Sequence, residues 1–196
     1  EVSGLPVSNG RVAGIACGSD VHSGDYVVFA GASYGTVLLR RAGLRLPIQP
    51  VKGYSLTFDR VDGGILPRHP IVDDDLHAAI APMGGGLRVA GTAEFAGFDS
   101  KLDKSRIDNL VAILARILPK VGIDIGAGRQ WCGFRAMSAD GVPMIGRTRV
   151  QNLFVNTGQG HLGWTMAAGA GRLVADLLTE SEPGIDPEPY SPLRFY

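Results

Sequence analysis

A glycine-rich loop between a predicted strand and a predicted helix constrains this chain more than any other feature. The segment 153–156 is mostly apolar, the loop TGQGHLG follows it, and a helix is predicted from about 164 to 178. Gly158, Gly160 and Gly163 allow backbone N–H groups to point at one partner, with the positive end of the helix dipole behind them. The loop therefore predicts a site that stabilises negative charge, although glycines at helix–sheet contacts offer a structural alternative.

A second strand–glycine–helix junction is predicted near the start of the chain. The run DYVVFA at 25–30 predicts a strand buried on both faces, as in the centre of a parallel sheet. Gly31 and Ala32 follow, and Ser33 is positioned to cap a short helix that ends near Gly43. Because a ligand crossing this sheet edge would meet main-chain atoms, the junction is a second candidate for binding an anion or a dipole.

The middle of the chain has the pattern of an antiparallel sheet. Short apolar segments alternate with the turn signals GG, DDD and GGG. A helix is predicted to begin at Asp103 or Ser105 and to stop before Pro119. Across the chain, further strands are predicted at 11–17, 54–59, 70–73, 76–82, 87–93 and 126–138.

These patterns divide the chain into three segments. Residues 1–50 and 137–196 carry the two strand–glycine–helix junctions, and residues 51–136 carry the antiparallel sheet with one long helix. The predicted fold class is therefore mixed, α+β with α/β units. The proline-rich ending PGIDPEPYSP is typical of an extended strap.

Charge and cysteine content exclude several classes of protein. Nineteen Lys and Arg residues balance nineteen Asp and Glu residues, so the strongly basic surface of a nonspecific nucleic-acid binder is missing. Cys17 and Cys132 lie in no metal-ligand spacing, which indicates neither a zinc site nor a disulfide framework. The sequence has no signal-peptide pattern or long apolar run, and we expect a reduced, cytoplasmic protein.

Four motifs together resemble the FAD-dependent D-amino acid dehydrogenases, relatives of the D-amino acid and glycine oxidases. The motifs are DYVVFAGASYGTVLLRRAGLRLPIQPVKGYSLTF, LRVAGTAEFAGFD, WCGFRAMSADGVPMIGRT and NLFVNTGQGHLGWTMAAGAGRLVADLL. They occur in the family's order and the resemblance covers essentially the whole chain. It implies part of a glutathione-reductase-like (Rossmann) FAD-binding domain together with an antiparallel substrate-binding domain.

The resemblance implies oxidation of a D-amino acid to a 2-oxo acid and ammonia, with FAD as cofactor and a quinone or dioxygen as electron acceptor. Arg135 occupies the position of the arginine that binds the substrate carboxylate in similar oxidases, and its fork matches a carboxylate. Tyr54 is a candidate to cover the flavin or bind the substrate, with a structural strand tyrosine as the alternative. No catalytic acid, base or metal ligand is assigned. A quinone-linked enzyme would also contact the inner membrane peripherally.

The implied FAD contacts are main-chain groups at the two glycine junctions. They comprise Gly31, Ala32, Gly158, Gln159, Gly160, His161, Leu162 and Gly163. The family commonly has histidine where Gln159 stands and threonine where His161 stands, so His161 inherits no role from the family. Glu94 has no cationic partner that the sequence identifies, and we expect it to be solvated or structural.

The family's GxGxxG, the pattern that binds the FAD pyrophosphate, lies in an N-terminal βαβ unit, and no strand followed by GxGxxG opens this chain. The resemblance therefore implies that an N-terminal half or a partner chain supplies this loop, and that the present chain is inactive alone. Two alternatives stay open. One is a fragment of a glycine- or sarcosine-type amine oxidase, and the other is a noncatalytic domain or subunit that binds no FAD unaided.

Overall fold

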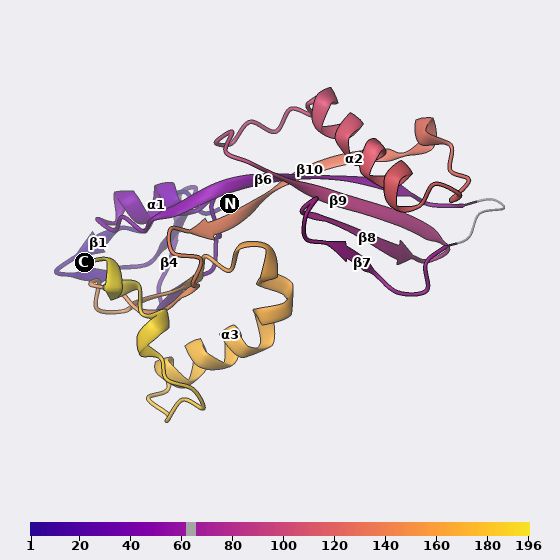
Figure 1. The fold of residues 1–196 in the computed structure, drawn as a ribbon. Helices are drawn as coiled ribbons and strands as arrows, with labels where there is room; N and C mark the ends of the chain where they lie inside the picture. Colours follow the sequence, from indigo (N-terminus) through magenta and orange to yellow (C-terminus); the bar gives the residue numbers. More distant parts are fainter. Residues whose placement is uncertain (62–65) are drawn as a thin grey trace. The chain divides into compact units, whose positions relative to one another are not determined.

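The computed structural model describes residues 1–61 and 66–196, which form two compact units (Figure 1). The first unit comprises Glu1–Pro50 and Arg135–Tyr196, and the second comprises Val51–Phe134. Each unit has its own cluster of buried apolar side chains. Each therefore has the hydrophobic core that a compact domain needs.

The first unit is built on a three-stranded sheet in the order β11-β12-β5. Its strands are β5 (Val27–Phe29), β11 (Met144–Arg147) and β12 (Leu153–Thr157). Strand β12 pairs parallel to β5 and antiparallel to β11. The predicted strand at 153–156 and the predicted parallel pairing of the strand at 25–30 are thus confirmed.

Two short antiparallel hairpins precede this sheet. They consist of β1 (Val7–Ser8) with β2 (Arg11–Val12), and of β3 (Ile15–Cys17) with β4 (Asp20–His22). The single strand predicted at 11–17 is therefore wrong, because the chain turns at Gly14 between β2 and β3. Gly14 lies so close to β4 that an added Cβ would be 2.8 Å from the carbonyl oxygen of His22.

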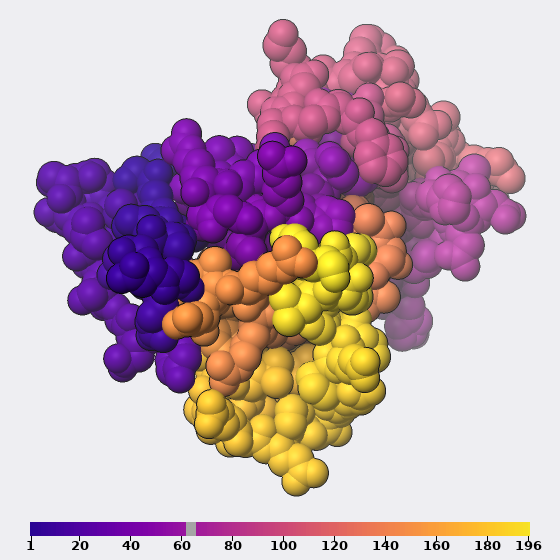
Figure 2. All heavy atoms as spheres, turned by 90° about the vertical axis from the view of Figure 1, so that its left-hand side faces the viewer, coloured from indigo at the N-terminus to yellow at the C-terminus, as the bar shows by residue number. Residues whose placement is uncertain are grey.

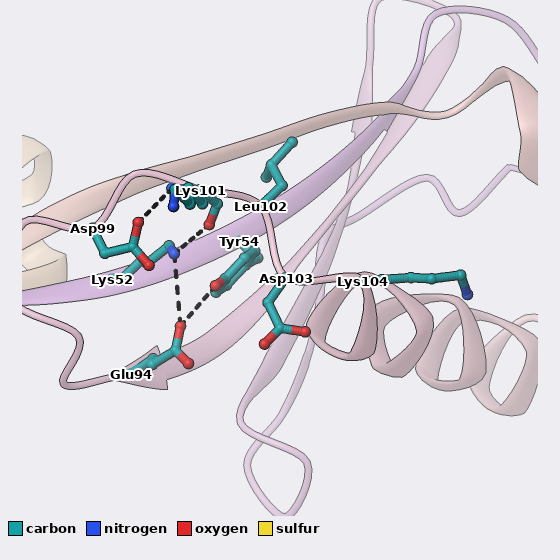
Figure 3. Close-up of a pocket in the computed structure, with 8 residues that line it drawn as sticks. All are labelled: Lys52, Tyr54, Glu94, Asp99, Lys101, Leu102, Asp103 and Lys104. Atoms are coloured by element: carbon teal, nitrogen blue, oxygen red, sulfur yellow. Dashed lines mark hydrogen bonds and ion pairs between the residues drawn. The ribbon is translucent and has the colours of Figure 1, made fainter.

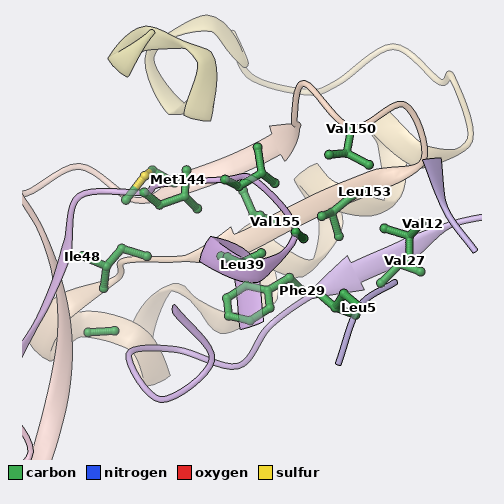
Figure 4. Close-up of a cluster of buried hydrophobic side chains, with 14 residues drawn as sticks. Leu5, Val12, Val27, Phe29, Leu39, Ile48, Met144, Val150, Leu153 and Val155 are labelled. Atoms are coloured by element: carbon green, nitrogen blue, oxygen red, sulfur yellow. The ribbon is translucent and has the colours of Figure 1, made fainter. Parts of the chain in front are cut away.

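Apolar side chains from the sheet and from α1 (Thr36–Arg41) form the core of the first unit (Figure 4). Val27 and Phe29 point into this core, whereas Val28 between them is 39% exposed. The expectation of a strand buried on both faces is wrong for the described residues. Strand β5 lies at the edge of its sheet, so only one of its faces is covered.

The α1 helix ends as predicted but begins differently. Gly43 has φ +82°, its N–H donates to the carbonyl of Arg40, and the N–H of Leu44 donates to Leu39, which is the Schellman termination. At the other end the N-cap is Gly35, with no side-chain cap hydrogen bond. Ser33 is therefore not the cap: its carbonyl accepts a bond of 2.9 Å from the hydroxyl of Thr36.

The α3 helix (Gly163–Leu178) packs on β11 and β12, which confirms the predicted C-terminal helix. Its buried side chains Ala170, Leu173 and Val174 contact Ile145 and Phe154 of the sheet. Gly169 and Gly171 make no close contact among the described residues, since no atom beyond the helix's own neighbouring backbone lies within 4 Å of an added Cβ at either position.

The C-terminal segment is a strap held by one arginine. It is not simply extended as predicted, because it contains the 3₁₀ turns Glu188–Tyr190 and Pro192–Phe195. Arg194 donates to both carboxylate oxygens of Asp140, at 2.8 and 3.1 Å, and to the carbonyls of Val142 and Pro143. Figure 2 shows these last residues, in yellow, lying against the orange part of the chain.

The Asp140–Arg194 pair should make the stability of the chain pH-dependent. Its hydrogen bonds from Arg194 lower the pKa of Asp140 from 3.8 to about 2. The stabilisation is therefore complete above pH 3.8 and lost as the pH falls towards 2. Because the Asp140 side chain is 37% exposed, screening limits the effect to about 1 kcal/mol.

We expect Asp140→Asn to remove this part of the pH dependence in urea unfolding between pH 4.5 and 2.5. An unchanged pH profile would contradict the assignment.

The second unit contains most of a five-stranded sheet in the order β10-β6-β9-β8-β7, of which residues 48–50 and 135–138 belong to the first unit. Its strands are β6 (Ile48–Phe58), β7 (Ile71–Asp73), β8 (Ala78–Met83), β9 (Gly86–Glu94) and β10 (Arg129–Ser138). The pairs β6–β9, β9–β8 and β8–β7 are antiparallel, as predicted. The turn predicted at Gly63 and Gly64 lies outside the described residues.

Strand β10 begins later than predicted. Asp124 accepts a hydrogen bond of 2.9 Å from the N–H of Gly126 and caps the 3₁₀ turn Ile125–Ala127. The backbone therefore enters the sheet only at Arg129.

The α2 helix (Lys104–Ile117) covers one face of the second unit's sheet. Asp103 is its N-cap, because its carboxylate accepts a bond of 2.8 Å from the N–H of Ser105. Ile107, Leu110 and Leu114 then pack with apolar residues of β6, β8 and β9. The predicted helix is confirmed, and of its two candidate caps the structure selects Asp103.

Leu110 is the residue whose truncation tests this core best. It is fully buried, and Gly91 of β9 is so close that an added Cβ would lie 3.1 Å from Cδ2 of Leu110. We expect Leu110→Ala to lower the free energy of unfolding by about 2–5 kcal/mol, because it leaves a cavity. Asn109→Ala, at an exposed position one residue earlier, is the matched control. Equal urea midpoints for the two variants would contradict this packing.

No helix among residues 1–61 and 66–196 is long and apolar enough to span a bilayer.

Candidate flavin and substrate sites

The glycine loop after β12 has a backbone that only glycine adopts easily. Gly158 and Gly160 have φ values of +83° and +59°, and a 3₁₀ turn (Gly160–Leu162) leads into α3. An added Cβ at Gly160 would lie 2.6 Å from Sδ of Met137, and one at Gly158 would lie 3.3 Å from Cβ of Ser138. Both glycines are therefore required by φ and by the close approach of β10.

Several hydrogen-bond donors around this loop have no acceptor among the described residues. The hydroxyls of Ser138 and Thr157 are buried and have no hydrogen-bond partner among the described residues. Leu162, the N-cap of α3, provides no side-chain cap, so the first N–H groups of α3 have no acceptor within the helix. The loop thus combines donors with a positive helix end, an arrangement suited to a ligand oxygen with negative charge.

The polar and exposed side chains of the loop turn elsewhere. Gln159 donates from its side chain to Oδ1 of Asn156 at 2.5 Å, and its backbone forms a bridge to Met137. His161 and Leu162 are exposed. The loop would therefore meet a ligand mainly through its main chain.

At the junction after β5, two glycines pack against the aromatic ring of Phe29. Gly31 lies against Phe29, where an added Cβ would be 3.0 Å from Cε2, and Gly35 lies against the same ring. Ala32 has φ +49°, and the buried hydroxyl of Ser33 has no partner among the described residues. A cavity of about 350 Å³ opens here, lined by apolar residues that include Val28, Ala30 and Leu38.

The two glycine junctions lie at the same edge of the sheet. Val155 of β12 pairs with Phe29 of β5 in a parallel register, so the carboxyl ends of both strands point the same way. Gly31 and Gly158 each follow one of these ends. Ligands of open α/β sheets bind at this edge, which makes the two loops parts of one candidate cofactor site.

Arg135 is a half-buried residue of β10. Burial lowers the pKa of its guanidinium below its ordinary value. An arginine retains its charge at neutral pH even so, and a partly desolvated guanidinium binds a carboxylate more strongly than a solvated one.

Tyr54 is buried in the second unit, with 1% of its surface exposed (Figure 3). Its hydroxyl donates to Oε2 of Glu94 at 2.7 Å, and its ring belongs to the apolar cluster that includes α2 residues. Tyr54 also lines a cavity of about 350 Å³ with Lys52 and Glu94 (Figure 3), although almost none of its own surface is exposed. Its surroundings favour the structural alternative considered for this tyrosine.

Glu94 and Lys52 form a polar network that the sequence does not reveal. Oε2 of Glu94 lies 3.9 Å from Nζ of the buried Lys52, and Oε1 lies 3.5 Å from Nε of Arg106. Lys52 also donates to the carbonyl of Lys101. These contacts agree with the expectation that Glu94 is structural. They also show its cationic partners, Lys52 and Arg106, which the sequence did not identify.

The pKa values in this network fix its protonation states. Burial raises the pKa of Tyr54, so its hydroxyl stays protonated and donates. The hydrogen bond with Tyr54 raises the pKa of Lys52, and burial opposes that effect only in part. Lys52 is therefore a permanent cation, which balances Glu94.

A β-bulge explains why sequence spacing did not disclose this network. Lys52 pairs with Glu94 and Tyr54 pairs with Gly91, so the one residue of β6 between these pairs opposes two residues of β9. Thr92 absorbs the extra residue at φ +69°. Only the register between distant strands, and no local motif, places Glu94 beside Lys52 and Tyr54.

No group of three or more His, Cys, Asp or Glu side chains among residues 1–61 and 66–196 is arranged to hold a metal ion. Cys17 and Cys132 are both free thiols.

Comparison with known proteins identifies the class to which this fold and these loops belong. The family model of FAD-dependent oxidoreductases called DAO matches residues 1–177. The chain therefore belongs to the DAO family of FAD-dependent oxidoreductases, and within it the chain is a homologue of D-amino acid dehydrogenases.

Two curated relatives show the homology to D-amino acid dehydrogenases. The D-amino acid dehydrogenase of Xanthobacter autotrophicus is 44% identical over 99% of this chain and 46% of its own length. That of Sinorhizobium medicae is 41% identical over 95% of this chain and 44% of its own length. The present chain thus spans somewhat less than half the length of these relatives.

Solved structures show the same fold. Glycine oxidase from Geobacillus kaustophilus matches with a TM-score of 0.83 and 26% identity, over 97% of this chain and 51% of that one. L-Proline dehydrogenase from P. horikoshii matches with a TM-score of 0.86 and 22% identity, over 100% of this chain and 53% of that one. The chain is therefore a mixed α/β fragment of the DAO fold with an antiparallel sheet.

The described residues fit the cofactor of this family. A flavin ring reduced by two electrons carries negative charge on its pyrimidine part, and the loop after β12 offers donors without acceptors. The two partnerless hydroxyls of Ser138 and Thr157 and the glycine positions that a Cβ would fill meet that requirement.

Proposed function

We propose that this chain is part of an enzyme that oxidises D-amino acids to 2-oxo acids and ammonia with FAD as cofactor. The observation that carries the proposal is the pair of glycine junctions at one sheet edge, in a chain 44% identical to a D-amino acid dehydrogenase. The residues of the proposed site are Arg135 for the substrate and main-chain groups of Gly31, Ala32 and 158–163 for FAD.

In this proposal the two units take different tasks. Residues 1–50 and 137–196 are segments of a glutathione-reductase-like Rossmann domain for FAD, and residues 51–136 form the substrate domain. Support comes from the parallel pairing of β5 with β12 in the first unit and the antiparallel pairings in the second. A Rossmann domain also needs a pyrophosphate loop of the GxGxxG type within a βαβ unit. Gly158, Gly160 and Gly163 have that spacing, but no strand follows α3 among the described residues.

The chain's own residues orient the substrate and stabilise charge. Arg135 binds the carboxylate with two parallel N–H···O bonds, which fixes Cα in one orientation. N–H groups of the loop 158–163 and the start of α3 stabilise negative charge at the pyrimidine oxygen of the flavin. Bound FAD would supply a two-electron acceptor for the hydride of Cα. The amino group would lose a proton as the imino acid forms, and water would hydrolyse the imino acid to the 2-oxo acid and ammonia. Tyr54 acts indirectly, through the hydrogen bond that its hydroxyl donates to Glu94.

A panel of three substrates tests the proposal against the related amine oxidases. We expect the intact holoenzyme to turn over D-alanine with a kcat/KM at least tenfold above those for glycine and sarcosine. A preference for glycine or sarcosine would favour the amine-oxidase alternative, since Arg135 would bind the carboxylate of any of the three. The electron acceptor is assigned in the same assay by comparing a soluble quinone with dioxygen.

Flavin absorbance of the 196-residue chain tests the noncatalytic alternative. Because the chain spans less than half the length of its curated relatives, we expect the purified chain to be colourless and to bind added FAD only weakly. Mixing it with the N-terminal half of a D-amino acid dehydrogenase should restore visible flavin absorbance. A folded mixture that stays colourless would favour a domain that takes no part in flavin binding.

A further inference from the structure

A polar cavity in the second unit is a feature that the proposed function leaves unused. Its volume is about 350 Å³, and it lies between β6, the end of β9 and the segment that leads into α2 (Figure 3). Of its eight lining residues, seven carry a charged group or a hydroxyl, and all eight belong to the second unit. The volume is in the range of sites that bind small molecules.

Lys52 is the most deeply buried charge at this cavity, with a side chain that is 2% exposed. Its ammonium donates to the carbonyl oxygen of Lys101 and has a hydrogen bond with Tyr54. Oε2 of Glu94, at 3.9 Å, is too distant to accept a third hydrogen bond. Because an ammonium has three donors, one N–H of this buried cation has no acceptor among the described residues.

Two exposed aspartates at the cavity also keep unused oxygens. Oδ1 of Asp99 accepts a bond of 3.0 Å from the main-chain N–H of Lys101, and Oδ1 of Asp103 accepts from the N–H and the hydroxyl of Ser105. The Oδ2 atoms of both aspartates have no hydrogen-bond or ion-pair partner within 1–61 and 66–196. Lys101 takes part in these contacts through its main chain.

Two other charges of the lining are matched already. Lys104 donates to Asp108 at 2.6 and 2.8 Å, and in Figure 3 its side chain points away from the other residues drawn. Glu94 accepts from Tyr54 at 2.7 Å and lies 3.5 Å from Nε of Arg106. The cavity therefore offers one donor of a buried cation together with two anionic acceptors.

We propose that this cavity binds a free amino acid, with its carboxylate at Lys52 and its ammonium at Asp99 and Asp103. A simple anion would satisfy Lys52 but would be repelled by the aspartates, and a simple cation would leave the buried N–H without an acceptor. A zwitterion matches charges of both signs. The inference goes beyond the proposed function, because it assigns a second set of amino-acid contacts that does not include Arg135.

Equilibrium dialysis with radiolabelled D-alanine tests this site on the flavin-free 196-residue chain carrying Arg135→Ala. That background removes the carboxylate site proposed above, so the result does not depend on the proposed function. We expect one D-alanine to bind per chain. Propionate has no ammonium and D-alaninamide has no carboxylate, so each should compete at least about tenfold more weakly than unlabelled D-alanine.

Three substitutions in the same background test the contacts one at a time. Lys52→Met keeps the length of the side chain and should weaken binding by about 10- to 100-fold, the range for a hydrogen bond with a charged group. Asp99→Asn keeps the oxygen that accepts from Lys101 and should weaken binding by up to about fivefold, because exposed charge pairs contribute little. Asp75→Asn, an exposed position outside the cavity, is the control and should change nothing.

The three ligands decide the outcome even if a variant fails to fold. Equal competition by D-alanine, propionate and D-alaninamide, or no saturable binding of D-alanine, would overturn the inference. Equal losses in Asp99→Asn and Asp75→Asn would overturn the role of Asp99. Flavin reduction by D-alanine in the intact holoenzyme tests the proposed function separately, so either proposal can fail without the other.

Discussion

Arg135→Ala in the intact holoenzyme is expected to raise KM for D-amino acids by roughly 30- to 4000-fold. Removing one partner of a desolvated, hydrogen-bonded charge pair costs roughly 2–5 kcal/mol, and each 1.4 kcal/mol is a factor of ten. The half-buried position of Arg135 places it in that regime rather than among exposed ion pairs. Arg135→Lys should recover only part of the loss, because an ammonium group cannot make the two parallel bonds of a guanidinium. Steady-state kinetics measure both variants.

Two comparisons separate carboxylate binding from a structural role of Arg135. Arg129→Ala removes an exposed arginine from the same strand, one that pairs with Asp59 at 3.1 Å, and should change KM less than twofold, as exposed pairs contribute little. An amide of the D-amino acid has no carboxylate, so wild type and Arg135→Ala should oxidise it equally well. Unchanged KM for D-alanine in Arg135→Ala would remove this residue from the substrate site.

Gly160→Ala is expected to weaken FAD binding by roughly 10- to 100-fold. The residue has φ +59°, where a side chain costs about 1–2 kcal/mol, and its Cβ would lie 2.6 Å from Sδ of Met137. The loop must therefore shift, and its N–H groups shift with it. Titration of the apoprotein with FAD, followed by flavin fluorescence, measures the change.

Gly169→Ala is the matched control for this variant. Gly169 lies within α3, its φ is in the ordinary helical range, and an added Cβ meets no atom beyond the neighbouring backbone within 4 Å. The same substitution should leave FAD affinity unchanged there and stabilise the helix by about 0.5–1 kcal/mol. Equal FAD affinities for Gly160→Ala and Gly169→Ala would contradict a flavin contact at the loop.

Local sequence patterns predicted most of the elements that carry the candidate sites. The alternation of apolar residues with GGG and DDD predicted β7, β8 and β9, and the apolar spacing from Ile107 to Leu114 predicted α2. These features depend on turns and periods of a few residues. The glycine loop before α3 was predicted equally well, because an apolar segment precedes it and a helical pattern of apolar residues follows it.

What the sequence did not predict depends on contacts between distant segments. The face of β5 that carries Val28 is exposed because this strand has one pairing partner among the described residues, which its run of apolar residues could not disclose. Glu94 meets Lys52 and Tyr54 through a bulge in β9, and Arg194 meets Asp140 across 54 residues. Ser33 lost its predicted cap role because Gly35 begins the helix instead.

Anaerobic reduction of the bound flavin tests the central proposal most directly. D-Alanine is added to the purified intact holoenzyme without an electron acceptor, and the visible flavin absorbance is followed. We predict that the absorbance bleaches with D-alanine at a rate that saturates with its concentration, and that it stays constant with L-alanine. A flavin that remains oxidised in the presence of every D-amino acid tried, in a holoenzyme that dithionite reduces normally, would contradict the account.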